Sequence, residues 1–179
     1  MKKRVIIALL ALVLVPAAAG ARGIGLGVFG GASIPILQDN ASQGTQFGLR
    51  VPVNVVPLLT VEPFYSKSSL GDKTVTFGGL SYTRDGGDVA AFGVNALLTV
   101  GGPVSFYPFV GLTSSKITRS GAADLSKTGY NFGLGLGITP MPKLRVDVRG
   151  ELNAVVTDQT SRKFGNITGG VSYALFNMP

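Results

Sequence analysis

The stretch from Lys143 to Val156, KLRVDVRGELNAVV, alternates between apolar and charged side chains almost without a break. Side chains of a β-strand point to opposite faces with a period of two, so this stretch places an apolar face opposite a charged face. In a soluble sheet the charged face meets water. In a membrane barrel the apolar face meets lipid and the charges point into the lumen. The rest of the sequence decides between these two arrangements.

The N-terminus has the order of a secretory signal peptide. A basic segment, Lys2 to Arg4, precedes an apolar run from Val5 to Val15, and small residues follow at positions 17–21. The apolar run is shorter than the roughly 20 residues that a transmembrane helix needs. We therefore expect residues 1–21 to be a cleaved signal and residues 22–179 to form one exported domain.

The composition excludes several classes of function. There is no Cys, which excludes disulfides and thiolate chemistry, and no His, which excludes a Ser-His hydrolase. The net charge is +7, but part of it lies in the signal, and no basic cluster interleaved with aromatic residues indicates a nucleic-acid partner. Asp85 and Asp88 lie in a Gly-rich stretch and are better explained as solvated turn residues than as catalytic acids. The sequence thus predicts no enzyme, no cofactor and no metal site.

Seven further alternating segments accompany the first, and the 26 glycines break the chain into short runs typical of all-β folds. One register stays open, because Phe106, Val110 and Leu112 compete with Tyr107 and Phe109 for the apolar face of their strand. The eight predicted strands are 23–36, 45–56, 59–67, 88–100, 104–116, 127–139, 143–156 and 164–176.

The connections between these strands alternate in length. Longer polar loops follow the first, third, fifth and seventh strands, and tight turns such as 56–58 and 140–142 follow the others. Outer-membrane barrels have this asymmetry, with short periplasmic turns and long external loops. The longest connection, 68–87, contains the strand-like fragments 74–77 and 80–83, which we expect to lengthen the neighbouring strands. We predict an eight-stranded antiparallel up-and-down transmembrane β-barrel.

Strands 127–139 and 143–156 favour the membrane barrel over a secreted soluble barrel. Gly133, Gly135 and Gly137 share one face, beside the charged face of the next strand. In a narrow lumen these glycines make room for long charged side chains, whereas on a solvent face they only weaken the strand. Because buried charges persist when paired, we predict a balanced lumen charge network that acts as a plug, not as a selectivity ring or proton path. Its predicted members are Arg50, Glu62, Arg145, Asp147, Arg149 and Glu151.

The chain resembles the small eight-stranded outer-membrane barrel family, the OmpA/OmpX-like group. The resemblance rests on the signal, the strand-loop rhythm and the ending GVSYALF, which looks like the family's C-terminal strand with an aromatic residue at its close, here Phe176. Phe176 is out of phase with Val171, Tyr173 and Leu175, and three residues follow it. The resemblance implies a monomeric protein of the bacterial outer membrane with a structural or surface-interacting role and no transferable catalytic residue.

The expected partners are outer-membrane lipids and an external surface partner that contacts the long loops. Arg119, Lys127 and Lys163 are the candidates for contacts with lipid phosphates, although solvated loop charge is the plainer interpretation. The alternative function is binding or transport of a small apolar ligand. A lateral gap in the strand hydrogen bonding, near one of the internal prolines, would favour that alternative.

Overall fold

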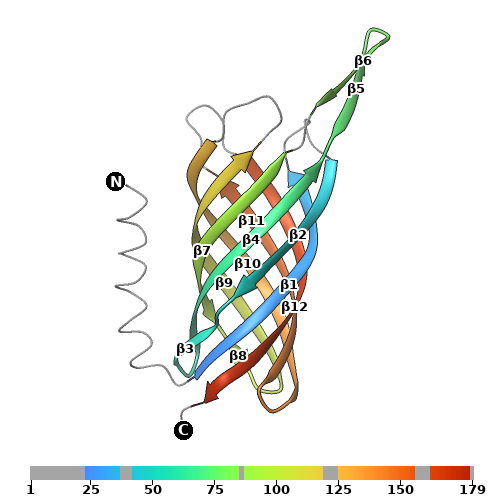
Figure 1. Ribbon diagram of the computed structural model, residues 1–179. Coiled ribbons are helices and arrows are strands. Elements are labelled where there is room, and N and C mark those ends of the chain that lie inside the picture. Colours follow the sequence, from blue (N-terminus) through green and yellow to red (C-terminus); the bar gives the residue numbers. More distant parts are fainter. Residues whose placement is uncertain (1–22, 37–41, 85–86, 119–124, 156–161, 178–179) are drawn as a thin grey trace.

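The structure is a computed structural model that describes residues 23–36, 42–84, 87–118, 125–155 and 162–177. Regular elements in these ranges are all β-strands (Figure 1). In the described residues no helix is long and apolar enough to cross a membrane. The strands are β1 (Gly23–Ile36), β2 (Ser42–Arg50), β3 (Val53–Val56), β4 (Leu59–Gly71), β5 (Lys73–Phe77), β6 (Leu80–Arg84), β7 (Asp88–Leu98), β8 (Val100–Gly101), β9 (Val104–Thr118), β10 (Leu125–Met141), β11 (Leu144–Val155) and β12 (Arg162–Asn177).

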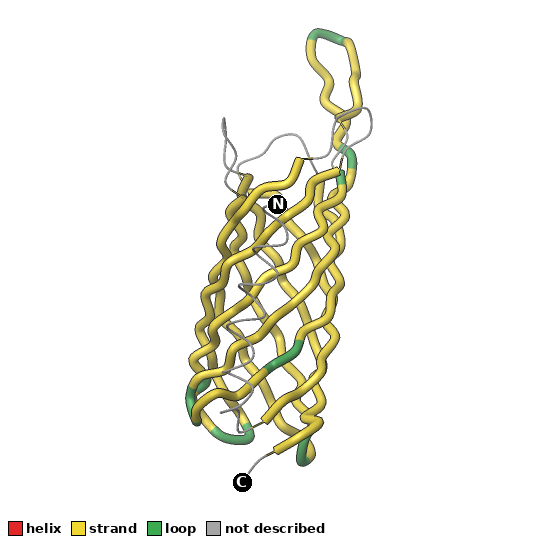
Figure 2. Tube along the Cα trace, turned by 60° about the vertical axis from the view of Figure 1, so that its left-hand side comes forward, coloured by secondary structure: helices red, strands yellow, loops and turns green. Residues whose placement is uncertain are grey.

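The main sheet closes on itself into a barrel (Figures 1 and 2). Its order is β10-β11-β12-β1-β2-β4-β7-β9, and β9 pairs with β10 to complete the ring. β3 continues the path of β2 in the barrel wall, and β8 continues the path of β7. The described chain therefore forms eight antiparallel barrel strands, and the predicted fold is confirmed. Closure pairs backbone groups between neighbouring strands, which is the condition for a sheet to lie in lipid. We call the end with the β3–β4, β8–β9 and β10–β11 turns the tight-turn end, and the opposite end the loop end.

Pro52 interrupts the second barrel strand, between β2 and β3. Proline has no N–H to donate to a neighbouring strand. Neighbouring strands bridge the break, because the Gly25 N–H donates to the Pro52 carbonyl at 2.8 Å and the Val51 N–H donates to the Pro63 carbonyl at 2.9 Å. Pro63 keeps its place in the β4–β7 register and Pro108 in the β9–β10 register. On its other side the pairing of β9 is interrupted at Pro108, between the Leu97–Phe109 and Val100–Phe106 pairs.

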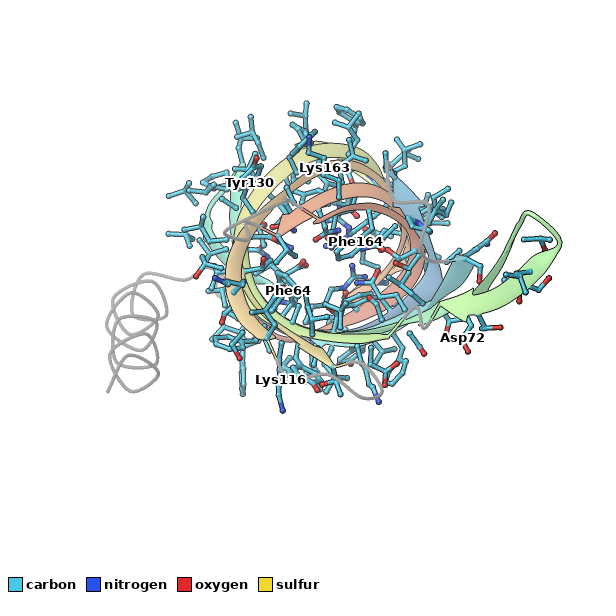
Figure 3. All side chains as sticks on the ribbon, turned by 90° about the horizontal axis from the view of Figure 1, so that it is seen from above. Phe64, Asp72, Lys116, Tyr130, Lys163 and Phe164 are labelled. Carbon is cyan, nitrogen blue, oxygen red and sulfur yellow. The ribbon has the colours of Figure 1, made fainter. Side chains whose placement is uncertain are left out.

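The strands turn apolar side chains outward and polar side chains inward (Figure 3). Seen from the loop end, Phe64 and Phe164 lie inside the ring of strands, whereas Tyr130 and Lys116 point away from it. This distribution is the reverse of a soluble barrel and fits lipid contact. Exposed outer residues include Leu26, Val28, Leu49, Tyr65, Phe92, Leu98, Val110, Leu112, Phe132, Leu134, Leu136, Val148, Leu152, Ile167, Val171 and Tyr173. Buried polar residues include Ser33, Gln46, Thr60, Ser66, Asn95, Thr113, Asn131, Asn166 and Thr168.

Glycines of β10 make room for side chains from both neighbouring strands. A Cβ atom at Gly137 would lie 2.6 Å from Nε of Arg145 on β11, which agrees with the interpretation of the glycine row. At Gly135 and Gly133, however, a Cβ atom would collide with the rings of Tyr107 and Phe109 on β9. The sequence therefore predicted the role of Gly137, but not that Gly133 and Gly135 make room for aromatic rings of β9. The rings of Tyr107 and Phe109 point inward and Phe106 is exposed, which resolves the register left open above.

A β-bulge near the end of β12 changes the facing of Phe176. Ile24 pairs with Phe176 and Gly25 pairs with Ala174, so Leu175 is the extra residue. A bulge of this kind shifts the alternation of the residues beyond it. Leu175 and Phe176 are consequently both exposed, although strict alternation places them on opposite faces.

β5 and β6 form a hairpin that projects beyond the loop end of the barrel (Figures 1 and 2). We expected these fragments to lengthen the neighbouring strands, but β4 ends at Gly71 and the hairpin is a separate two-stranded sheet. Its turn residues Gly78 and Gly79 have φ of 60° and 84°, the left-handed conformation that a two-residue type I′ turn requires. The side-chain hydroxyls of Thr76 and Ser81 pair across it at 2.8 Å. We call residues 73–84 the hairpin arm.

Candidate functional site

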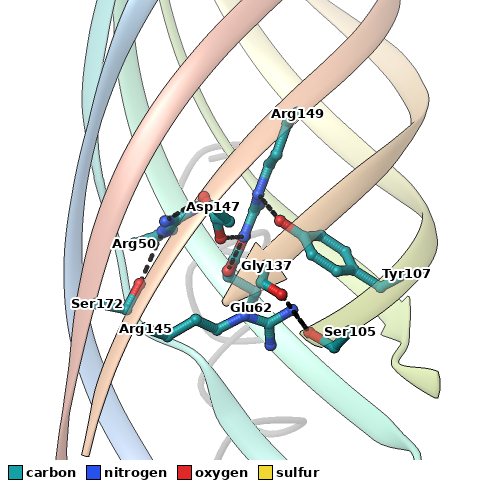
Figure 4. Close-up of polar contacts among 9 residues, drawn as sticks. All are labelled: Arg50, Glu62, Ser105, Tyr107, Gly137, Arg145, Asp147, Arg149 and Ser172. Atoms are coloured by element: carbon teal, nitrogen blue, oxygen red, sulfur yellow. Dashed lines mark hydrogen bonds and ion pairs between the residues drawn. The ribbon is translucent and has the colours of Figure 1, made fainter. Parts of the chain in front are cut away.

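Arg149 is the centre of a polar cluster that crosses the lumen (Figure 4). Its Nη1 and Nη2 atoms donate to Oε1 and Oε2 of Glu62 on β4 at 2.5 and 2.9 Å, and its Nε donates to the Tyr107 hydroxyl of β9 at 2.9 Å. A planar guanidinium matches a carboxylate through two parallel bonds, which orients both groups. One arginine thus joins β11 to β4 on the opposite side of the ring and to β9, from which β11 is separated by β10 alone.

The cluster continues from Arg149 to β2 through Asp147. Nη2 of Arg50 donates to Oδ1 of Asp147 at 2.9 Å, and Nη2 of Arg149 lies 3.4 Å from Oδ2 of the same carboxylate. Nε of Arg50 donates to the Ser172 hydroxyl of β12 at 3.1 Å. The order Arg50, Asp147, Arg149 and Glu62 alternates in sign, so each charge has an opposite charge beside it.

All four charges of this chain are withdrawn from solvent. Arg50 and Glu62 are each 1% exposed, Asp147 is 3% and Arg149 is 7%. Buried charges are costly unless they are paired and hydrogen-bonded, and here the alternating signs meet that condition. The Phe29 ring lies 5.8 Å from the Arg50 guanidinium carbon, within the range of a cation–π contact. The charges are therefore held by both ionic and aromatic neighbours.

The structure places Arg145 and Glu151 outside this chain of ion pairs. Nη2 of Arg145 donates to the Ser105 hydroxyl at 3.1 Å, and its guanidinium carbon lies 4.5 Å from the centre of the Tyr107 ring. Glu151 lines a cavity of about 10 Å³ together with Arg149. Among the described residues neither Arg145 nor Glu151 has an ion pair within 4.0 Å. Of the six predicted members, four are linked by ion pairs.

Sequence reasoning missed the neutral partners of the cluster. Ser105, Tyr107 and Ser172 each accept a hydrogen bond from an arginine, and they come from β9 and β12. The signal for Tyr107 was the competition between two faces of its strand, which the sequence left open. Elsewhere in the lumen, the side-chain Nδ2 of Asn131 donates to the side-chain Oδ1 of Asn95 at 2.9 Å. The inner surface is thus a hydrogen-bonded lining as well as a set of charges.

The Arg149–Glu62 pair separates two cavities of the lumen. The cavity of about 260 Å³ lies toward the tight-turn end, and the cavity of about 10 Å³ lies toward the loop end. Both residues line both cavities, so the ion pair forms the wall between them. The cross-section at this level is filled by side chains.

Two of the three candidate lipid-phosphate residues are described, and both lie toward the loop end. Lys127 on β10 is half-buried, Lys163 on β12 is exposed, and Arg119 lies outside the described residues. At the same end Lys67 and Asp88 form an ion pair at 3.3 Å with both side chains nearly half exposed. Lys163 lies on the outer side of β12, whereas Lys127 shares its side of β10 with the buried, lumen-facing Asn131, and neither belongs to the ion pairs that cross the lumen.

Comparison with known proteins gives a family and a fold. A family model described as "Outer membrane protein beta-barrel domain" matches residues 5–174. Neisserial surface protein A (NspA) superposes with a TM-score of 0.67 at 15% identity, over 86% of this chain and 98% of that chain. Ail, the attachment invasion locus protein of Yersinia pestis, was solved with the heparin analogue sucrose octasulfate. It superposes with a TM-score of 0.56 at 20% identity, over 86% and 99%.

The N-terminal β-barrel domain of Pseudomonas aeruginosa OprF is a further structural match. Its TM-score is 0.51 at 14% identity, over 86% of this chain and 99% of that domain. A search of curated protein sequences finds no match. At these identities the solved structures establish a shared barrel fold and nothing more specific.

Proposed function

Because this chain belongs to the outer membrane protein β-barrel domain family, we propose that it is a non-enzymatic barrel of the bacterial outer membrane that acts through its external surface. One observation carries the proposal: a lumen crossed by ion pairs is combined with a hairpin arm that stands clear of the barrel (Figure 2). A filled lumen leaves the loop end as the part of the molecule that can meet a partner. Family topology places long loops outside the cell and tight turns in the periplasm.

The charge cluster supports the plug in this proposal. The alternating charges of Arg50, Asp147, Arg149 and Glu62 join the three strands β2, β11 and β4. A barrel of eight strands is only wide enough for side chains to fill it. We expect purified, refolded protein in planar bilayers to give no steady channels. Stable porin-like conductance steps from the intact protein would contradict the plug.

The hairpin arm supports the surface-interacting role. Its register pairs Lys73 with Arg84, and residues 73–84 carry a formal charge of +2. A segment with excess positive charge attracts an anionic partner. Ail was solved with a sulfated sugar, so a sulfated polysaccharide is the first probe to use. We propose that the arm takes part in binding an anionic surface partner.

Binding of whole cells to immobilised heparin tests the role of the arm. One variant lacks residues 73–84, and a second keeps the arm but carries Lys73→Gln and Arg84→Gln. Because the arm is a sheet separate from the barrel, both variants are expected to fold and to keep heat-modifiable gel migration. We expect both to lose binding. Binding equal to that of the unchanged protein in both variants would refute a role for the arm.

The lipid contacts form a second part of the proposal. Lys163 is exposed toward the loop end, where a cation near an anionic leaflet attracts lipid phosphates, and Lys127 and Arg119 complete the proposed set. Replacing all three with Gln should lower lipid retention during purification and weaken the outer-membrane barrier to detergents. Unchanged lipid retention and unchanged barrier function in the triple variant would remove this part.

Export through a cleaved signal and a monomeric state complete the proposal. The basic and apolar order of residues 1–21 supports cleavage at the end of that segment. N-terminal sequencing of protein extracted from outer membranes should begin near residue 22, and light scattering in detergent should give the mass of one chain. An intact N-terminus in the extracted protein would contradict cleavage.

A further inference from the structure

The lumen holds a cavity of about 260 Å³ between the ion-paired cluster and the tight-turn end, and the surface-interacting role does not use it. The cations Lys143, Arg145 and Arg149 line it, together with the carboxylates of Glu62 and Asp147. Hydrogen-bonding groups complete its polar wall, and apolar side chains form the rest. These polar residues are Asn54, Thr60, Thr139 and Ser172. The volume is larger than a single water molecule requires, so a small polyatomic ligand can enter.

Both carboxylates in the wall are already engaged by arginines. Asp147 accepts from Arg50 at 2.9 Å and lies 3.4 Å from Arg149, and both oxygens of Glu62 accept from Arg149. Arg145 has no carboxylate within 4.0 Å among the described residues. The cavity therefore has more positive charge than its own carboxylates neutralise.

The Arg145 guanidinium is held in place while part of its hydrogen-bonding capacity stays unused (Figure 4). Gly137 lies close against it, the Tyr107 ring lies 4.5 Å from its central carbon, and the Ser105 hydroxyl accepts from Nη2 at 3.1 Å. Nε is buried against Gly137 and makes no hydrogen bond, so a ligand in the cavity would meet the terminal nitrogens of the guanidinium. Arginine has five N–H donors, and an arginine fixed in this way is preorganised to bind oxygen atoms of an anion.

Lys143 adds a second cation on the solvent side of the cavity. It lies in the β10–β11 turn with φ of 72°, and its side chain is exposed. Its backbone carbonyl accepts from the Ala174 N–H at 2.7 Å, which ties the turn to β12. A fixed turn keeps the ammonium group near the entrance, where it can attract an anion before Arg145 binds it.

We propose that this cavity is a binding site for a phosphate group, held between Arg145 and Lys143 at the tight-turn end of the lumen. Charge-assisted bonds from a guanidinium suit the paired oxygens of a tetrahedral oxyanion, and the surrounding hydroxyls supply further donors. Chloride has no separate oxygen atoms to distribute among these donors. The phosphate group belongs either to the free ion in the periplasm or to a lipid headgroup that reaches the barrel end.

Calorimetric titration and thermal unfolding in a phosphate-free nonionic detergent test the site. Inorganic phosphate should bind and raise the unfolding temperature relative to chloride at equal ionic strength. Arg145→Gln should weaken binding by about 10- to 100-fold, the effect of losing charged hydrogen bonds, and Lys143→Gln should weaken it less. Lys67→Gln is the matched control, because Lys67 forms its ion pair with Asp88 at the loop end, away from the cavity. This variant should bind phosphate normally.

A second experiment, in lipid bilayers, identifies the source of the phosphate group. If Arg145-dependent stabilisation appears with inorganic phosphate in detergent, the free ion is the ligand. If it appears only in phosphatidylglycerol vesicles and not in phosphatidylcholine vesicles, the ligand is a lipid headgroup. The proposal would be overturned if inorganic phosphate acts like chloride in detergent and phosphatidylglycerol vesicles also give no Arg145-dependent stabilisation. It would likewise be overturned if any stabilisation is equal in Arg145→Gln and the unchanged protein. If Arg145→Gln fails to fold, the exposed Lys143→Gln variant decides the outcome by the same comparison.

Discussion

Replacing Glu62 with Gln should lower the free energy of unfolding of the barrel by about 3 kcal/mol. The carboxylate accepts two hydrogen bonds from Arg149, at 2.5 and 2.9 Å, and Gln keeps one acceptor while it turns an NH₂ group toward the guanidinium. A hydrogen bond to a charged group contributes about 1.5–3 kcal/mol, and breaking a buried ion pair costs about 3–5 kcal/mol. Asp147 cannot fully replace Glu62, because its Oδ1 atom is already bound to Arg50.

The pair is best measured as a double-mutant cycle. Arg149→Met removes the cation and leaves Glu62 buried without its main partner, so this single change should also destabilise the barrel strongly. The double variant should cost less than the two single changes together, by about 2 kcal/mol or more, because each single change leaves a buried charge behind. Unfolding in urea, followed by the migration difference between folded and unfolded bands, gives all four stabilities.

The rim ion pair supplies the control for this cycle. Lys67 and Asp88 lie 3.3 Å apart with side chains 45% and 44% exposed. Exposed ion pairs contribute about 0–1 kcal/mol, so Lys67→Gln should change stability by no more than that. If Glu62→Gln costs no more than Lys67→Gln, or if the two lumen changes are additive, the cluster does not hold the barrel in the way inferred from its geometry.

Two further predictions concern positions along the strands. Gly135→Ala should lower the free energy of unfolding in urea by about 1–3 kcal/mol, because the added Cβ would collide with the Tyr107 ring. At Gly150 an added Cβ meets nothing within 4 Å, so Gly150→Ala should be neutral or slightly stabilising. Equal costs at the two glycines would refute the packing argument. Leu134→Arg, on the outer face, should cost about 2–4 kcal/mol in lipid vesicles, whereas Leu80→Arg, on the hairpin arm, should cost close to nothing; equal effects would contradict the placement of the outer face in lipid.

The strands and their facings were largely predictable because the information is local. In β1, β4, β10 and β11 the apolar and polar side chains alternate with a period of two, and that period depends only on backbone geometry. The register of β9 was not predictable, since Phe106 and Tyr107 are both large and aromatic. Its facing depends on space left by Gly135 on a neighbouring strand. The facing of Phe176 also depends on a neighbour, because its bulge exists only in the pairing with β1.

The sequence alone determined that this chain forms a closed barrel with apolar residues outside and charged residues inside. Except in β9 and at the end of β12, it also determined which side chains enter the lumen, because alternation assigns each residue to a face. Only the tertiary structure decided which charges meet. Arg50 is 97 residues from Asp147 and Glu62 is 87 residues from Arg149, and whether they meet depends on the stagger and closure of the strands. For the same reason, the structure alone separates Arg145 from the ion pairs and leaves its guanidinium facing a cavity.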